Sequence, residues 1–314
     1  MRLAFFGTPD FAVPSLAALE TRHEVVAVVS QPDRPRGRGQ KTSASPVAAH
    51  AERNGLTVFR PERIKTEEFL SAFKALNVDL AIVAAYGRIL PAALLEVPPL
   101  GFINVHASLL PRWRGAAPIH RAVLAGDGET GVTIMRVVPA LDAGPMLAKV
   151  PLAIGPDETT AELEPRLAKA GAFLLAEVVD RLAAGPIHEE PQDERLVTYA
   201  ARIDRTEGRC NWDRPAPDIH NHIRGLQPWP LVSAHLHGRR VLLVRSQVAS
   251  ADEPQAVAPG TVTRVEPDGL VIAANPGTVR LLSIQPEGRS AMRVRDFLNG
   301  HRVSVGDRLE PVSS

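Results

Sequence analysis

The fold of the first half of the chain is decided by the stretch MRLAFFGTPDFAVPSLAALETRHEVVAVVS, residues 1–30. Two apolar runs of strand length, residues 3–6 and 25–29, enclose a helix-like segment at residues 10–20. Continuous apolar runs of this kind are typical of strands that are buried on both faces of a sheet. The stretch therefore predicts a β-α-β unit with parallel strands.

The same alternation continues up to residue 106. Further strand-like runs and helix-like segments follow one another at residues 45–54, 56–59, 66–76, 80–84, 91–95 and 102–105. Ser45 followed by Pro46 is typical of a helix start, and Gly55 of a helix end. We therefore predict an α/β fold with an open, mostly parallel, twisted sheet of the Rossmann type, covered by helices on both faces.

The pattern changes after residue 130. Two strands at 130–137 and 146–150 flank a short turn at 141–144, and a long helix is predicted at 159–184. After residue 208, short β-type runs separated by Pro-Asp-Gly and Asn-Pro-Gly turns predict a small antiparallel β-barrel. Residues 189–194 are polar and acidic, as expected of a connector. We expect a first domain at 1–188, a linker at 189–207 and a C-terminal β-barrel domain at 208–314.

Composition limits the classes of protein and of partner. The chain has 314 residues, 45% of them hydrophobic, and its 36 basic and 35 acidic side chains give a net charge of +1. This balance gives no overall attraction to nucleic acid or membrane. The single cysteine, Cys210, cannot form an internal disulfide, and we expect it to be a packing residue. No run of 18 apolar residues and no signal-peptide pattern is present, so we expect a cytoplasmic protein.

One short segment of the chain is strongly basic, although the net charge of the whole chain is close to zero. Four basic residues gather in one segment with no acidic residue among them: Arg34, Arg36, Arg38 and Lys41. Prolines and glycines lie between them, so we expect a loop that does not fold on itself and can lie on a phosphate backbone. The composition of this segment fits equally well a basic surface loop that contacts only solvent.

Candidate catalytic residues lie at the end of the run at 102–105 and directly after it, since ligands bind at the carboxyl ends of strands in open α/β sheets. Asn104 and His106 are two residues apart, so both side chains leave the same face of a strand. An amide beside an imidazole can stabilise a developing oxyanion and exchange protons near neutral pH. Asp142, in the predicted turn, could complete this set. The alternative is a turn cap, a buried histidine and a turn-forming aspartate, and the sequence alone leaves both open.

Other kinds of site have less support. The turn after residues 3–6 lacks the Gly-x-Gly-x-x-Gly spacing and the Walker lysine of nucleotide sites, and no Gly-x-Ser-x-Gly elbow is present. Four histidines lie within 18 residues: His220, His222, His235 and His237. The first two lie on a predicted helix, where side chains two residues apart diverge by about 200°. We therefore expect no metal site.

Several motifs carry a resemblance to a known family. They are FGTPDF (6–11), QPDRP (31–35), GRG (37–39), AYG (85–87), NVHASLLPRWRGAAPI (104–119), ETGVTIM (129–135), LDAG (141–144), NW (211–212) and PWP (228–230). Asn-x-His, Ser-Leu-Leu-Pro and the later Asp-x-Gly are similar to enzymes that use 10-formyltetrahydrofolate. The remaining motifs, and a match that runs essentially end to end, resemble the methionyl-tRNA formyltransferase family.

The resemblance implies formyl transfer from 10-formyltetrahydrofolate to the α-amine of methionyl initiator tRNA, for translation initiation. It implies that Asn104, His106 and Asp142 are catalytic and that no metal takes part. The implied folate-binding residues are Tyr86, Gly87, Ser108, Leu109, Leu110 and Pro111. The implied tRNA-binding residues are Arg34, Arg36, Arg38 and Lys41, together with a C-terminal barrel of the OB type. A monomer is the simplest expectation.

Two alternatives remain at this point. The same chemistry could serve another acceptor, such as glycinamide ribonucleotide, an amino sugar or water. A non-catalytic RNA-binding protein could also use this scaffold. The second domain and the basic segment favour a tRNA acceptor, because a small acceptor needs neither.

Overall fold

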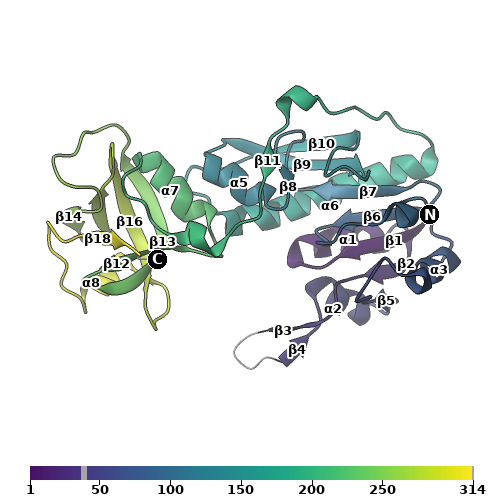
Figure 1. The fold of residues 1–314 in the computed structure, drawn as a ribbon, viewed down its shortest axis with the longest axis horizontal. Helices are drawn as coiled ribbons and strands as arrows, with labels where there is room; N and C mark the ends of the chain where they lie inside the picture. Colours follow the sequence, from purple (N-terminus) through teal and green to yellow (C-terminus); the bar gives the residue numbers. More distant parts are fainter. Residues whose placement is uncertain (37–40, 313–314) are drawn as a thin grey trace. The chain divides into compact units, whose positions relative to one another are not determined.

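The computed structural model describes residues 1–36 and 41–312. The chain divides in space into two compact units (Figure 1). The first contains Met1–Pro118, Thr130–Ala153 and Glu164–Ala200, and the second contains Ile119–Glu129, Ile154–Leu163 and Ala201–Ser314. Each unit contains several separate segments of the chain, whereas we predicted domains that follow one another, with boundaries at residues 188 and 208. The predicted boundaries stay a prediction.

A seven-stranded sheet forms the centre of the first unit, in the order β10-β9-β7-β6-β1-β2-β5. Its strands are β1 (Arg2–Gly7), β2 (Glu24–Val29), β5 (Val58–Phe59), β6 (Leu80–Ala84), β7 (Phe102–His106), β9 (Glu129–Arg136) and β10 (Met146–Ala153). The pairs β1–β2, β1–β6, β2–β5 and β6–β7 are parallel, and β7–β9 is antiparallel. The prediction of an open, mostly parallel sheet is confirmed.

The helices of this unit differ in whether a side chain caps their first turn. They are α1 (Val13–Glu20), preceded by the 3-10 turn η1 (Asp10–Ala12), and α2 (Pro46–Arg53), α3 (Glu67–Ala75), α4 (Ala92–Leu95) and α6 (Thr160–Ala184). The Ser45 hydroxyl accepts a hydrogen bond from the Ala48 amide at the start of α2, as its position before a proline predicts. Thr66 does the same for α3 through the amide of Phe69.

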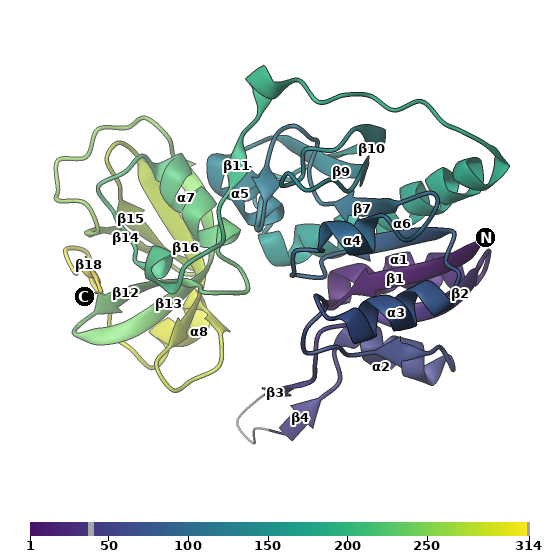
Figure 2. The same ribbon diagram turned by 45° about the vertical axis from the view of Figure 1, so that its right-hand side comes forward.

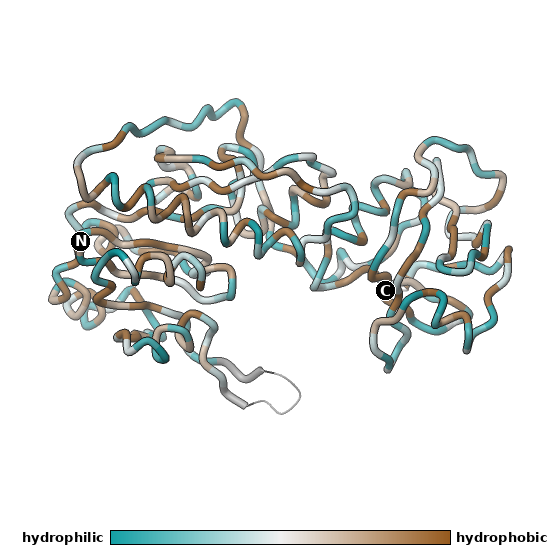
Figure 3. Tube along the Cα trace, turned by 180° about the vertical axis from the view of Figure 1, so that it is seen from behind, coloured by the Kyte–Doolittle hydropathy of each residue, from teal (hydrophilic) through white to brown (hydrophobic). Residues whose placement is uncertain are grey.

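Both faces of the sheet are buried beneath these helices (Figure 2). Ala4 and Phe6 of β1 pack with Phe73 of α3 in one cluster. The alternate residues of the same strand, Leu3 and Phe5, are also fully buried. This double burial explains why the central strands are apolar along their length (Figure 3).

Gly131 of β9 lies where no side chain fits. A Cβ there would overlap the backbone oxygen of Val150 and would lie 2.5 Å from Cδ2 of Leu109. Gly131→Ala is therefore expected to lower the free energy of unfolding by about 2 to 3 kcal/mol and the thermal midpoint by roughly 5 to 10 °C. Gly128→Ala is the control, since its Cβ would meet no atom of the described chain within 4 Å. Equal thermal midpoints for the two variants would contradict this prediction.

The basic segment forms a two-stranded hairpin. Strand β3 (Arg34–Arg36) pairs in antiparallel fashion with β4 (Lys41–Ser43), with Arg34 opposite Ser43 and Arg36 opposite Lys41. The expectation that this segment does not fold on itself is therefore wrong for these six residues, because backbone pairing forms despite the charge. Arg38 lies outside the described residues.

The second unit contains a curled antiparallel sheet in the order β14-β15-β16-β13-β12-β18, with β17 paired to β16. Its strands are β12 (Val232–Leu236), β13 (Arg239–Ser250), β14 (Val262–Glu266), β15 (Gly269–Ala273), β16 (Thr278–Pro286), β17 (Met292–Arg293) and β18 (Leu309–Pro311). Backbone hydrogen bonds from Val262 to Asp307 and from Leu309 to Gly260 link its two ends. The predicted small β-barrel is confirmed.

Helical segments complete this unit: α5 (Pro118–Ala125), η3 (Arg205–Gly208), α7 (Ala216–Gly225) and α8 (Val294–Leu298). Cys210 is almost completely buried, and this burial raises the pKa of its thiol. Within the described ranges, none of the helices combines the length and the apolar character that crossing a membrane requires.

Candidate active site

Loops from three strands meet at the carboxyl edge of the parallel sheet. The neighbours β1 and β6 leave in opposite directions along the sheet order, so a crevice is expected outside their carboxyl ends. Thr8 follows β1, Gln31 follows β2 and Tyr86 follows β6. The Thr8 hydroxyl and the Gln31 amide both donate hydrogen bonds to the Tyr86 carbonyl, at 3.3 and 2.8 Å. These bonds fix the loops around the edge at which β7 also ends.

Strand β7 carries two of the predicted catalytic side chains to this edge. Asn104 pairs with Val83 of β6 on one side and Met135 of β9 on the other, so its backbone is held from both sides. Asn104 is half-buried, and its amide group has no hydrogen-bond partner among residues 1–33 and 43–312. His106 ends the strand with 5% of its surface exposed. Both side chains leave the same face of the strand, as their spacing predicts.

The hydrogen bonds of His106 determine which of its nitrogens can exchange a proton. Nε2 lies 2.8 Å from the carbonyl oxygen of Trp113. A carbonyl oxygen can only accept, so Nε2 carries a hydrogen and donates it. Nδ1 faces the Asp142 carboxylate, with 3.8 Å between Nδ1 and Oδ2. At this distance the two groups interact through charge rather than through a hydrogen bond. Nδ1 is therefore the nitrogen that can gain or lose a proton.

Asp142 is fixed in a tight turn between β9 and β10. Its backbone is left-handed, with φ of +46°, and its Oδ2 accepts a hydrogen bond of 2.8 Å from the Gly115 amide. Trp113 and Ala85, in the neighbouring loops, are also left-handed, with φ of +70° and +47°. Such conformations cost about 1 kcal/mol or more each, and they concentrate at functional sites. The structure thus brings Asp142 beside His106, although 36 residues separate them.

Only some side chains of the predicted folate-binding segment, residues 108–111, are accessible to a ligand. The Ser108 side chain is fully buried, and its hydroxyl donates to the carbonyl of Arg112 at 2.6 Å. Leu110 is also buried, packed with Met135 and Met146. Ser108 and Leu110 therefore hold the turn, while Leu109 and Pro111 stay half-buried and keep accessible surface.

Of the other two predicted folate-binding residues, Tyr86 is buried and Gly87 is exposed. The Tyr86 ring is buried in the core, with its centroid 5.5 Å from that of Phe6. Gly87 is exposed and left-handed, with φ of +77°, and a Cβ there would approach the Gln31 amide. A ligand at this loop would meet the backbone rather than the Tyr86 side chain. The binding role of these six residues stays a prediction.

The sequence reasoning missed the residues that hold the catalytic groups in place. Trp113 and Gly115 act through backbone atoms, which accept from His106 and donate to Asp142. They form part of a second, two-stranded sheet region in which β8 (Arg114–Gly115) pairs with β11 (Tyr199–Ala200). Every residue has these backbone groups, so the sequence does not distinguish Trp113 and Gly115 by residue type. The only sequence signal for their role was their position shortly after His106.

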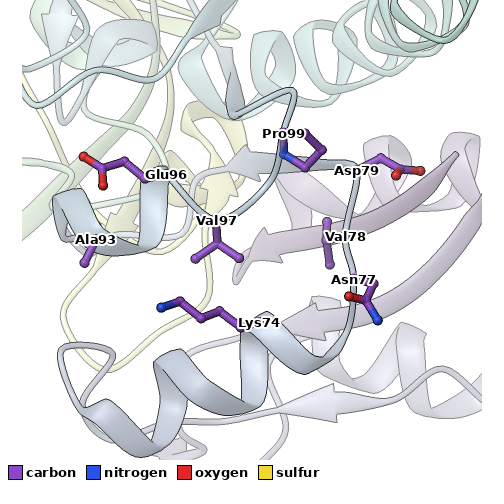
Figure 4. Close-up of a pocket in the computed structure, with 8 residues that line it drawn as sticks. All are labelled: Lys74, Asn77, Val78, Asp79, Ala93, Glu96, Val97 and Pro99. Carbon is purple, nitrogen blue, oxygen red and sulfur yellow. The ribbon is translucent and has the colours of Figure 1, made fainter.

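A shallow pocket lies at the opposite edge of the sheet, and Figure 4 shows eight of its residues, including Lys74, Asp79 and Glu96. Asp79 precedes the first residue of β6 and accepts a hydrogen bond of 2.7 Å from the Arg2 amide. The pocket is therefore at the amino ends of the strands. Ligands of open parallel sheets bind at the other ends, so we do not assign the reaction to this pocket.

His220 and His222, two of the four histidines that lie close together in the sequence, have separate partners. The His220 nitrogens contact the Ser246 hydroxyl and the Pro156 carbonyl, each at 2.9 Å, while His222 Nε2 contacts the Glu207 carbonyl at 2.6 Å. In the described part of the chain, no three His, Cys, Asp or Glu side chains are placed to hold one metal ion.

Comparison with known families agrees with this architecture. Residues 1–179 match the family model described as formyl transferase, and residues 202–302 match the one described as formyl transferase, C-terminal domain. The chain is thus a formyl transferase. The chain is 49% identical over 310 residues to the methionyl-tRNA formyltransferase of Paracoccus denitrificans (strain Pd 1222), covering 99% of this chain and 100% of that one. The Thermus thermophilus methionyl-tRNA formyltransferase is 46% identical over 312 residues, with 99% and 100% covered. The chain belongs to the methionyl-tRNA formyltransferase family.

Solved structures share the fold at low sequence identity. An N-formyltransferase from Helicobacter canadensis, in complex with folinic acid and dTDP-3-aminofucose, superposes with a TM-score of 0.67 at 18% identity, covering 89% of this chain and 98% of that one. The sugar 3N-formyl transferase WlaRD gives a TM-score of 0.69 at 16% identity, covering 92% and 99%. These likenesses support the two-part fold alone.

Proposed function

We propose that this protein transfers the formyl group of 10-formyltetrahydrofolate to the α-amine of methionyl initiator tRNA, giving the formylated tRNA for translation initiation in the cytoplasm. The observation that carries the proposal is identity of 46–49% over nearly the whole chain to methionyl-tRNA formyltransferases. The convergence of Asn104, His106 and Asp142 at one edge of the sheet supports it independently, because these groups suit acyl transfer. The protein acts as a monomer in this proposal.

The chemistry begins when the neutral amine attacks the formyl carbon. The new nitrogen–carbon bond turns the formyl oxygen into an oxyanion, which needs hydrogen-bond donors. The Asn104 amide supplies one donor, since it has no other partner in the described chain. Protonated Nδ1 of His106 supplies the second, because Nε2 already donates to Trp113.

The bond between the carbon and N10 of the folate then breaks. The attacking amine loses one proton and N10 gains one, so the reaction needs no net proton. His106 and Asp142 relay this proton in the proposal, through the nitrogen that faces the carboxylate at 3.8 Å. No covalent enzyme intermediate is required.

The β3–β4 hairpin is proposed to contact the acceptor end of the tRNA. Removing the charge of Arg36 or Arg38 with alanine is expected to raise the KM for tRNA about tenfold and to flatten the salt dependence of kcat/KM, because fewer phosphate counterions are released. The KM for folate should not change. Lys74→Ala is a matched control, since Lys74 lines the pocket at the opposite edge of the sheet. An unchanged salt dependence would leave the hairpin as solvated surface.

The function is tested by offering 10-formyltetrahydrofolate with methionyl initiator tRNA, methionyl elongator tRNA and a nucleotide-linked amino sugar in parallel. We expect efficient formylation of the initiator tRNA alone. Formylation of the sugar instead would favour the alternative acceptor. Tight tRNA binding without formyl transfer to any acceptor would favour a non-catalytic RNA-binding protein.

A further inference from the structure

The chain returns to the active-site turn after α6 ends. Met146 of β10 and Glu190 exchange two backbone hydrogen bonds, both of 2.8 Å. This bridge holds Glu190 beside the first residue of β10, the strand that follows Asp142. The segment that we expected to be a connector therefore makes specific contacts within the first unit.

Gln192 uses every polar group of its side chain in this position. Its Nε2 donates to two carbonyl oxygens of the turn, those of Asp142 and Gly144, each at 2.8 Å. Its Oε1 accepts a hydrogen bond of 2.9 Å from Nε of Arg114. An amide is the group that offers two donors and an acceptor in one plane. The Gln192 side chain thus links two backbone carbonyls of the turn to Arg114.

Arg114 is itself held firmly. Only 4% of its side chain is exposed, and its remaining guanidinium nitrogens donate to both carboxylate oxygens of Glu194, at 3.2 and 2.7 Å. The next residue, Gly115, donates its amide to the Asp142 carboxylate. Arg114 therefore holds the backbone of the turn through Gln192, and Gly115 holds the Asp142 side chain directly.

These contacts act on a strained element. Asp142 has φ of +46°, a conformation that a residue other than glycine keeps only where its surroundings enforce it. The Asp142 carboxylate must face His106 Nδ1 for the pair to interact, and a misplacement of about 1 Å in a catalytic group can cost a hundredfold in rate. The bonds from Gln192 limit that displacement.

We infer that Gln192 is a positioning residue for formyl transfer, which acts through Asp142 and is itself held by Arg114 and Glu194. The inference rests on the proposed function, in which Asp142 is catalytic. It assigns Gln192, within the predicted linker, a role in the reaction.

Two variants test the inference. Gln192→Leu removes all three hydrogen bonds, and Gln192→Glu removes both donors while it keeps the acceptor for Arg114. Each is expected to lower kcat about 10-fold to 100-fold, with the KM for folate and for tRNA within about threefold of wild type. Arg195→Ala is the matched control, because Arg195 pairs with Asp193 in the same segment with 88% of its side chain exposed. Its kcat should stay at the wild-type value.

A double-mutant comparison separates positioning from general stability. If Gln192 acts only through Asp142, Gln192→Leu should lower kcat less than about twofold in an Asp142→Asn background. If the kcat of the double variant fell by the product of the two single losses, the inference would be overturned. A kcat within about twofold of wild type in both Gln192→Leu and Gln192→Glu would also overturn it.

Amide hydrogen exchange across residues 137–147 gives a readout that does not depend on activity. It should accelerate in both Gln192 variants with little change in thermal midpoint, and unchanged exchange would also overturn the inference. If the wild-type protein formylates no methionyl-tRNA, the proposed function fails, while the exchange result still decides whether Gln192 holds the turn.

Discussion

Replacing His106 with alanine is expected to lower kcat for formyl transfer about a hundredfold to ten-thousandfold. The variant loses Nδ1, the only ring nitrogen that is not donating to the Trp113 carbonyl. It therefore loses both a donor to the oxyanion and the proton relay. Single-turnover formylation of methionyl initiator tRNA measures the effect directly, because it separates chemistry from product release.

The control for His106 is His50→Ala. His50 lies on α2 and contacts the Glu20 carboxylate at 3.0 Å, away from the carboxyl edge of β7. Its loss should leave kcat within about twofold of wild type. Thermal midpoints near the wild-type value in both variants would show that the His106 effect is chemical. A His106→Ala rate within tenfold of wild type would refute the assigned role.

The parallel sheet could be predicted because its signals are local. Buried strands read as continuous apolar runs, and Ser45 and Thr66 mark helix starts through side chains that cap the first turn. The relation between Asn104 and His106 follows from the two-residue period of a strand. These features need no knowledge of distant parts of the chain.

The position of Asp142 could only be proposed from the sequence. Its approach to His106 depends on the turn between β9 and β10 and on the Gly115 amide, neither of which appears in local composition. The resemblance to a family supplied this pairing, and the structure brings the two residues together. Their catalytic role stays a prediction until it is measured.

Composition misled at the basic segment. The basic segment suggested a loop without structure, yet β3 and β4 pair through backbone groups that charge does not remove. The polar composition of residues 189–194 fits a connector, and that role stays a prediction. The contacts of Gln192 could not be predicted, because it bonds to backbone carbonyl oxygens, which every residue carries.

Asp142→Asn is expected to lower kcat about a hundredfold or more while the fold is kept. Asparagine has nearly the same volume, and its Oδ1 can still accept the hydrogen bond from the Gly115 amide. What disappears is the negative charge 3.8 Å from His106 Nδ1, through which the pair relays the proton in the proposed reaction. Asp142→Ala removes the scaffold bond as well, so it should be slower still and less stable.

Asp180→Asn provides the comparison for this charge. Asp180 also faces a histidine, with 3.0 Å between its Oδ1 and His23 Nε2, but it lies on α6 and takes no part in the proposed reaction. A loss in Asp142→Asn that Asp180→Asn does not share would assign the effect to the charge beside His106. Near-normal turnover of Asp142→Asn would instead mean that the carboxylate serves only to hold the turn, and the proton relay would then need another route.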